Sequence, residues 1–431
     1  MNHWIAAVIG LIAGGALLVL LGVLVLSLPL VGGRLLWVLA RREWVPVSYN
    51  LRSLARRKTS TASTFVVLAL VVFVLTAVMM LAQGIAHTLT STAPPLNVKL
   101  MMRRGTVEWH SYIPFELMSR LSALPGIAPN AQGAPLISPE LVVLIWAERG
   151  GADPDDGANL TVRGVHPIAF ELHPLQIREG RSFETGKDEI IIGKALVGRF
   201  AGATLGGRMT FADHDWTVVG IADHGGTAHD SEIWGDIEVM APTFKRGYCS
   251  ATLRLSDRSE LDGLAAALAS NPDTSAYVAR REVDYWRSLS EQSVNFVRLL
   301  GAAVVVVFSF GAILGALNTM YAQVTARTRE LGTLRAIGFK PRAILVSLVL
   351  ESVLLSLAAG VLGVLGASLL ENVTFELSTV QTLSEITYGF HLSPRLALAS
   401  LGFAVLLGYA GGLLPALRAA RMPIVNAVRA D

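Results

Sequence analysis

A short polar stretch separates two long apolar runs: Asn318-Thr-Met-Tyr-Ala-Gln-Val-Thr-Ala-Arg-Thr-Arg-Glu-Leu-Gly-Thr-Leu-Arg-Ala-Ile-Gly-Phe-Lys-Pro-Arg342. It carries five basic side chains and a single acid, Glu330. Basic residues beside short membrane spans favour the cytoplasmic side. The stretch is too short to be a domain and too strongly patterned to be a tether. We therefore interpret it as the surface through which a cytoplasmic protein acts on a membrane-embedded part.

The composition indicates a membrane protein with a substantial soluble part. Of the 431 residues, 52% are hydrophobic and 16% are charged, and the mean hydropathy is +0.51. Soluble proteins usually have about 25% charged residues. Residues 85–294 contain 19 Lys and Arg against 26 Asp and Glu, whereas the rest of the chain contains 17 against 7. Short basic loops are typical of the cytoplasmic side of a membrane protein, and a large acidic block is typical of an external domain. We therefore attribute the net positive charge of the chain to membrane topology rather than to nucleic-acid binding.

Five apolar runs are long enough to cross a membrane core of ~30 Å at about 1.5 Å per residue. They are Trp4–Gly33, Phe65–Ala82, Leu299–Leu317, Ala343–Leu370 and Leu396–Leu417. For the first run a signal peptide is the alternative, but the basic residues follow the run and no clear cleavage site closes it. The link 371–394 holds three acids and no base. The loop charges therefore predict an external N-terminus, an external 371–394 link and a cytoplasmic C-terminus.

A basic segment precedes the second run. In Tyr49-Asn-Leu-Arg-Ser-Leu-Ala-Arg-Arg-Lys58 the apolar residues fall at helical spacing and the arginines fall on other faces. This pattern predicts an amphipathic helix on the inner membrane surface. A charged topology anchor with no partner is the alternative, and both interpretations place the segment in the cytoplasm.

The acidic block 85–294 has a mixed pattern that predicts an α+β domain. Strands are expected at 141–146, 160–165, 190–192, 251–255 and 277–280, a hairpin at 209–221, and helices at 113–124 and 261–268. Two lobes are expected, one from 95–165 with 251–285 and one from 166–250. A helix that starts near Val283 is expected to run unbroken into the third apolar run, because no Gly or Pro interrupts 282–300.

The predicted fold is an α-helical integral membrane protein with five transmembrane helices and a large α+β extracytoplasmic domain between the second and third. The expected parts are 1–33, an extra N-terminal transmembrane helix; 34–61, a cytoplasmic linker with the amphipathic helix; 62–84, a transmembrane helix; 85–294, the external domain; and 295–431, a permease domain with three transmembrane helices, the coupling loop 318–342 and a cytoplasmic tail.

No catalytic, cofactor-binding or metal-binding residue is predicted. Gly332 to Gly338 lacks the spacing of a phosphate-binding loop, so any ATP must be bound by another chain. A hydrolase would need a nucleophile on a sharp turn, and no G-x-S-x-G is present. The only cluster with metal-binding types is Asp213, His214, Asp215, Asp223, His224, His229 and Asp230. Its members lie in predicted turns, where Asp is favoured for backbone hydrogen bonding, so we interpret them as turn residues.

Glu351 is the only charge inside the fourth apolar run. An intramembrane acid is costly unless it is paired or hydrated, so it marks a functional group by default. The alternative is an acid that reaches Arg342 or a backbone partner at the inner rim. Small residues in the spans, Gly311, Gly315 and Gly360 among them, predict close helix packing within the chain. A dimer seam at Gly311 and Gly315 is the sharper interpretation.

Several of these motifs together resemble the permeases of the MacB/FtsX/LolC type of ABC transporter. They are Asn318-Thr-Met, Thr328-Arg-Glu-Leu-Gly-Thr-Leu-Arg-Ala-Ile-Gly338, Glu351, the tail from Gly411 to Arg429, the amphipathic 49–58 segment, and the external pieces Asp188-Glu-Ile-Ile-Ile-Gly-Lys-Ala-Leu and Trp216-Thr-Val-Val-Gly-Ile. The tail departs from the family pattern because Pro423 falls one position early. The resemblance covers about residues 50–431.

The resemblance implies a dimeric, multi-pass permease of the bacterial inner membrane with an ABC ATPase bound on its cytoplasmic side. It assigns the ATPase-coupling contact to Arg329, Glu330, Leu331, Gly332, Arg335 and Gly338. ATP would be bound by the partner, and the chain itself would not be an enzyme. The second permease copy is expected to be identical, and the external domain would meet an adaptor, a lipoprotein or a hydrophobic, peptide or lipid-type cargo.

Two points remain open at this stage. The family's usual permease has four spans, so the run Trp4–Gly33 is a departure, and we expect no ATPase domain fused at that end. The main hypothesis is export, and the alternative is a regulator that relays ATPase motion to a periplasmic enzyme, as in the cell-division branch. The large external domain favours export. A third hypothesis, an external binding module with no ATPase, would be removed by co-purification of an ATPase.

Overall fold

The computed structural model describes residues 58–150, 156–173, 175–378 and 383–423, which form two compact units. The helical unit contains 58–82, Phe296–Asn372 and 391–423, and the sheet unit contains Gln83–Asn295 and Val373–Phe390. The predicted span Trp4–Gly33 and nearly all of the amphipathic segment 49–58 lie outside the described residues.

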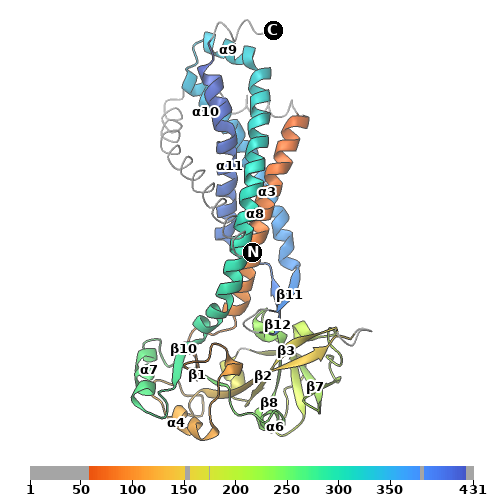
Figure 1. Ribbon diagram of the computed structural model, residues 1–431, viewed down its shortest axis with the longest axis vertical. Helices are drawn as coiled ribbons and strands as arrows, with labels where there is room; N and C mark the ends of the chain where they lie inside the picture. The colour runs from red at the N-terminus through yellow and green to blue at the C-terminus, as the bar shows by residue number, and fades with distance from the viewer. Residues whose placement is uncertain (1–57, 151–155, 174, 379–382, 424–431) are drawn as a thin grey trace, which may run out of the picture. The chain divides into compact units, whose positions relative to one another are not determined.

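Four helices in the described part of the chain are long and apolar enough to cross a membrane (Figure 1). They are α3 (Lys58–Thr90), α8 (Glu282–Ala326), α10 (Pro341–Ser368) and α11 (Pro394–Arg421). Each corresponds to one of the predicted spans, although the predicted span Ala343–Leu370 runs two residues beyond the end of α10. Pro341 and Pro394 stand at the first helical positions, where proline needs no amide partner. The oxygen of Ser393 caps α11 by accepting a hydrogen bond from the amide of Leu396 at 3.2 Å.

Small residues let the helices of this unit pack closely. A Cβ built on Gly360 of α10 would lie 2.5 Å from the Cβ of Ala404 in α11, and one built on Gly411 of α11 would lie 2.6 Å from the Cβ of Ala316 in α8. A side chain at either position would force the helices apart. Helices α10 and α11 run side by side (Figure 1).

The sheet unit is built on one ten-stranded sheet with the order β10-β1-β9-β2-β3-β8-β5-β7-β4, and β6 pairs with β7. Its strands are β1 (Asn97–Met102), β2 (Ile137–Glu148), β3 (Gly157–Val165), β4 (Gln176–Gly180), β5 (Glu189–Gly193), β6 (Arg208–Phe211), β7 (His214–Asp223), β8 (Glu232–Asp236), β9 (Ser250–Arg254) and β10 (Tyr277–Arg281). The β3–β8 and β5–β7 pairs are parallel and the others are antiparallel. The predicted strands and the 209–221 hairpin are confirmed.

Short helices and turns complete the unit: η1 (Glu108–His110), η2 (Phe115–Leu117), α4 (Met118–Ser122), α5 (Ala169–Leu172), η3 (Lys194–Leu196), η4 (Ala228–Ser231), α6 (Ile237–Thr243) and α7 (Glu260–Ser270). The predicted helix 261–268 corresponds to α7, whereas the predicted helix 113–124 is reduced to η2 and α4. The β6–β7 turn consists of Ala212 and Asp213, whose φ values are 54° and 55°. Two consecutive positive φ values match the twist of a two-residue hairpin.

The two predicted lobes share one sheet. Strand β3 belongs to one predicted lobe and β8 to the other, yet they pair in parallel from Thr161 with Glu232 to Val165 with Asp236. Two apolar clusters nevertheless lie along the sheet, one around Leu100, Leu253 and Leu264 and one around Leu160, Ile192 and Trp216. The lobes are therefore two cores on a continuous sheet rather than two separate bodies.

The link 371–394 contains a hairpin that the sequence analysis missed. Strands β11 (Thr374–Ser378) and β12 (Glu385–Gly389) pair antiparallel. Glu385 bonds to both Arg149 and Arg199, and the amide of Thr387 donates to the hydroxyl of Ser231 at 3.0 Å. These contacts explain why 373–390 belong to the sheet unit.

Candidate functional site

The polar stretch that follows α8 is largely helical. Helix α8 ends at Ala326, the chain bends at Arg327, and the short helix α9 spans Thr328–Ala336. Gly338 ends α9 with a φ of 113°. Its amide donates to the carbonyl of Arg335, and that of Phe339 donates to the carbonyl of Leu334. This is the Schellman arrangement, which favours glycine because L side chains are strained at positive φ.

Glu351 is paired with the bend residue, a partner that the sequence analysis did not propose. The Nη1 of Arg327 lies 3.0 Å from the Oε2 of Glu351, and both side chains are almost fully buried. Arg327 also approaches Glu330, with 3.4 Å between Nε and Oε2. The pair joins the start of α9 to the interior of α10 and neutralises a charge inside the apolar helix.

Two further residues of α9 attach it to the neighbouring helices. Leu331 is buried in an apolar cluster with Val324 of α8, Ile344 of α10 and Ala416 of α11. The Nη1 of Arg335 donates to the carbonyl of Met422 at 2.7 Å and approaches that of Ala420 at 3.4 Å. A basic group on the last carbonyls satisfies the C-terminal end of α11. Helix α9 therefore contacts the ends of all three helices.

The other face of α9 is exposed. Arg329, Glu330 and Gly338 are exposed, and Ile337 exposes 73% of its surface. Gly332 is buried, as Leu331 is. Of the six residues that the resemblance assigns to coupling, Arg329, Glu330 and Gly338 thus lie on the open face, while Leu331, Gly332 and Arg335 lie toward the helical unit. Ile337 is not among the coupling residues predicted from the sequence, although it is an aliphatic residue directly before Gly338.

The glycines assigned to packing differ from one another. Gly360 packs α10 against α11. Gly311 and Gly315 lie on an exposed face of α8, where a Cβ at either position would meet nothing within 4 Å among the described residues.

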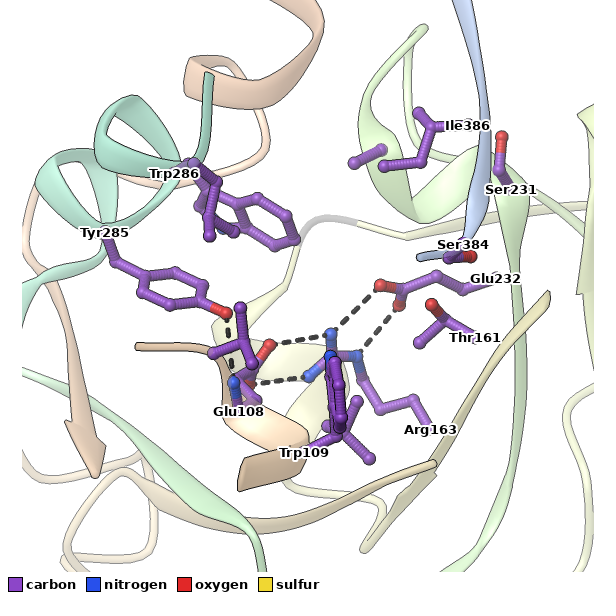
Figure 2. A pocket seen from close by; sticks show the side chains of 14 residues that line it. Glu108, Trp109, Thr161, Arg163, Ser231, Glu232, Tyr285, Trp286, Ser384 and Ile386 are labelled. Atoms are coloured by element: carbon purple, nitrogen blue, oxygen red, sulfur yellow. Dashed lines mark hydrogen bonds and ion pairs between the residues drawn. The ribbon is translucent and has the colours of Figure 1, made fainter. Parts of the chain in front are cut away.

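The sheet unit contains a buried network of charges that the sequence analysis missed. Its members are Lys99 of β1, Glu108 of η1, Glu140 of β2, Arg163 of β3 and Glu232 of β8. Lys99 Nζ lies 2.9 Å from Glu108 Oε1. Arg163 Nε lies 2.8 Å from Glu232 Oε2. Figure 2 shows Arg163 between Glu108 and Glu232. The signal available in the sequence was one charge inside each of several apolar strands.

Opposite charges keep this network ionised. Burial raises the pKa of Glu108, but Arg163 and Lys99 outweigh it and lower that pKa to about 2. Arg163 likewise holds the pKa of Glu232 well below its ordinary range against the effect of burial. A cavity of about 30 Å³ beside the network is lined by Glu108, Arg163 and Trp286 among others, and has room for a water molecule or two (Figure 2). The network joins four strands and a 3₁₀ helix by charge-assisted bonds.

The predicted turn cluster is divided by the fold. Asp213 forms part of the β6–β7 turn, and His214 and Asp215 open β7. Asp223 bonds Lys194, and the oxygens of Asp230 accept the amides of His224 and Gly226 at 2.6 and 2.7 Å. These carboxylates thus stabilise loops. His229 does not lie with these loop residues; it is buried beside His173, with 5.0 Å between the ring centroids.

Comparisons with known proteins agree with this arrangement. A family model described as MacB-like periplasmic core domain matches residues 61–280, and one described as FtsX-like permease C-terminal matches residues 302–424. The Macrolide export ATP-binding/permease protein MacB of Hahella chejuensis is 25% identical over 297 residues, which are 63% of this chain and 43% of that protein. The MacB of Escherichia coli is 25% identical over 291 residues, 62% and 43% of the two chains. The chain thus spans less than half the length of these relatives.

Two solved structures match part of the chain only loosely. The extracellular domain of the ABC-type transporter YknZ from Gram-positive bacteria has a TM-score of 0.33 and 16% identity, over 43% of this chain and 99% of that domain. The periplasmic region of MacB from Actinobacillus actinomycetemcomitans has a TM-score of 0.33 and 14% identity, over 46% and 92%.

Apolar helices of spanning length, joined to a separate sheet unit, define an integral membrane protein with an extracytoplasmic domain. The two family models together cover most of the described residues, the MacB-like one covering 61–280 and the FtsX-like one 302–424. The chain belongs to the MacB/FtsX type of ABC transporter permeases.

Proposed function

We propose that the chain is the permease subunit of a bacterial ABC transporter of the mechanotransmission type. It would couple ATP hydrolysis by a separate cytoplasmic ATPase to motion of its periplasmic domain. The proposal starts from the family, whose members are components of ABC transporters.

One observation carries the coupling step. Helix α9 is bound to the rest of the helical unit through Arg327, Leu331 and Arg335, while Arg329, Glu330 and Ile337 remain exposed. A partner on the exposed face would push on a helix that cannot move without α8, α10 and α11. An exposed aliphatic side chain among charged ones is the composition of a docking surface with an apolar anchor. The chain's continuous helix α8 would transmit that motion.

The remaining features of the assembly belong to the same proposal. The chain would lie in the bacterial inner membrane with its N-terminus periplasmic and its C-terminus cytoplasmic, and it would pair with a second copy. A hydrophobic, peptide or lipid-type substrate, or a lipoprotein, would be exported with the help of a periplasmic adaptor. The relatives are macrolide export proteins by name, which supports export over the regulatory alternative.

The test is co-purification of the tagged full chain with an ABC ATPase of the same organism. We expect Glu330→Lys and Ile337→Asp to reduce ATPase recovery at least about tenfold, as loss of a docking anchor does. Glu291→Lys is the matched control, because it reverses an exposed acid of α8 in the sheet unit. Recovery that is equal for all three variants and the wild type would show that α9 is not the docking surface.

A further inference from the structure

Three buried side chains from separate segments converge beside the charge network of the sheet unit. They are His173, which follows α5, His229 of η4, and Glu282, the first residue of α8. A potential ligand atom of each lies within 4.8 Å of the other two. All three residues are at most 1% exposed.

The atoms that face one another lack hydrogen-bond partners. These atoms are Nδ1 of His173, Nε2 of His229 and Oε1 of Glu282. The His173 and Glu282 atoms are 3.9 Å apart. Lys99 Nζ lies 3.7 Å from the same Glu282 oxygen, but its closer contacts are to Glu108, Glu140 and Thr252. An unpaired buried polar atom is costly, so three at one point call for a ligand.

The opposite side of each group is held by a second residue. His173 Nε2 lies 3.0 Å from Glu140 Oε1, and His229 Nδ1 lies 2.8 Å from Glu232 Oε2. Each carboxylate fixes the ring proton on the nitrogen that it contacts, which leaves the lone pair of the other nitrogen directed at the common point. A carboxylate behind each histidine is the usual support of a metal ligand. The third group, Glu282, is supported on its other oxygen, because the Nδ2 of Asn97 donates a hydrogen bond to Oε2 at 3.0 Å.

The charges of the surroundings favour a divalent cation. Four buried carboxylates, those of Glu108, Glu140, Glu232 and Glu282, face only two buried cations, Lys99 and Arg163. The carboxylates outnumber these two cations by two, and one divalent ion would balance the difference.

We propose that His173, His229 and Glu282 bind a divalent first-row transition ion of the zinc class. Two imidazoles and one carboxylate suit Zn²⁺, with a fourth position open to water. Ligand atoms in a tetrahedral zinc site lie roughly 3.3 Å apart, so binding would draw the three groups together by up to about 1.5 Å. The ion would fasten the first residue of α8 to η4 and to the segment after α5.

The experiment uses the full chain in detergent, stripped with chelator and then dialysed against Zn²⁺ with excess Mg²⁺. Elemental analysis gives zinc per chain, and the visible absorption of the Co²⁺-substituted protein reports coordination geometry. We expect one zinc per chain and a tetrahedral cobalt spectrum. His173→Gln, His229→Gln and Glu282→Gln should each weaken zinc binding by well over about tenfold, because even a change in the supporting residues costs about 10–100-fold.

His224→Gln is the matched control. His224 is buried and stacks on Trp234 at 5.4 Å, beside His229, but it is outside the three-residue group. It should leave zinc binding unchanged. Wild-type protein that retains no zinc, or an octahedral cobalt spectrum, would overturn the proposal, as would equal binding by the three ligand variants. If the three ligand variants have much lower melting temperatures than the wild type even in chelator, their loss of zinc reflects misfolding. The zinc stoichiometry and the cobalt spectrum of the wild type then test the proposal.

Discussion

Glu351 is buried in α10 opposite Arg327, the residue at the bend between α8 and α9. From the sequence, this acid had two interpretations, a functional group or an acid satisfied at the rim. The observed partner lies in the polar stretch itself, 24 positions earlier in the chain. The two groups thus fix the geometry of the bend, and removing either one alone takes from the other its buried partner at 3.0 Å.

We predict that Glu351→Leu destabilises the chain by about 3–5 kcal/mol, because it removes the buried carboxylate that lies 3.0 Å from the buried guanidinium of Arg327. The double variant Arg327→Met with Glu351→Leu should recover most of that loss, since it removes both charges. Thermal unfolding of the full chain in detergent measures both effects. Arg329→Met, which removes an exposed charge of α9, is the control. A double variant no more stable than Glu351→Leu would contradict the pairing.

A second ion pair makes a prediction about pH. Arg181 contacts Glu189 with both Nη atoms, at 2.6 and 2.7 Å, and this bond lowers the pKa of Glu189 from 4.5 to about 2. As the pH falls, the carboxylate of Glu189 is therefore protonated in the unfolded chain before it is protonated in the folded chain. The contribution of the pair is present above pH 4.5 and is lost as the pH falls through 2.

The corresponding variant is Arg181→Leu. It should lower the melting temperature by a few degrees at pH 7, and the difference from the wild type should shrink between pH 4.5 and pH 2. Arg208→Leu, which removes an exposed arginine 3.4 Å from Asp215, should change little at any pH. Tryptophan fluorescence of the full chain follows the transition. A difference that stays constant with pH would mean that Glu189 is not the partner.

Gly338 determines where α9 ends. Its φ of 113° is open to glycine but strained for other residues. We predict that Gly338→Ala costs about 1–3 kcal/mol at this helix end. Hydrogen exchange of the amides at 334–339 should accelerate by roughly 5–150-fold, because the free energy of local opening falls by the same 1–3 kcal/mol. Gly263→Ala in α7, where a Cβ meets nothing within 4 Å, is the control and should leave exchange at 334–339 unchanged.

The predictable elements were those with a strong local pattern. Continuous apolar runs indicate the four described spans, the shorter apolar run 141–146 indicates β2, and alternating residues indicate β3 and β9. The β11–β12 hairpin was missed because its strands are mostly exposed and are fixed by distant partners, Arg149 and Arg199 on Glu385. The polar composition of 318–342 predicts a loop, whereas most of the coupling residues that the resemblance assigns there lie on helix α9.

The buried groups were harder to predict than the helices. Arg327 and Glu351, or His173, His229 and Glu282, are far apart in the sequence and meet only when several elements pack. A scan for neighbouring metal-binding types therefore selected Asp213 to Asp230, most of which bond to nearby loops. A single charge inside an apolar strand, such as Lys99 or Arg163, is the sequence signal that deserves weight, because such a residue must find a partner in the fold.

At the scale of the whole molecule, the proposed dimer makes the remaining prediction. Gly311 and Gly315 leave an exposed face on α8 that no described residue fills. Four-residue spacing of small residues permits close approach of a second helix. Gly315→Cys should therefore form a disulfide-linked dimer in membranes. The background needs no further change, because the sequence has a single cysteine, Cys249, which is fully buried.

Phe310→Cys is the matched control for this seam. Phe310 is exposed and adjacent to Gly311 along α8, but it points about 100° around the helix. Cross-linking under mild oxidation, read as the dimer fraction on non-reducing gels, should be several-fold higher for Gly315→Cys than for Phe310→Cys. Equal yields would indicate random collision, and a higher yield for Phe310→Cys would place the seam on another face of α8. A specific Gly315 cross-link would place two copies of α8 side by side. Each copy would then present one exposed α9 face to the ATPase of the proposed function.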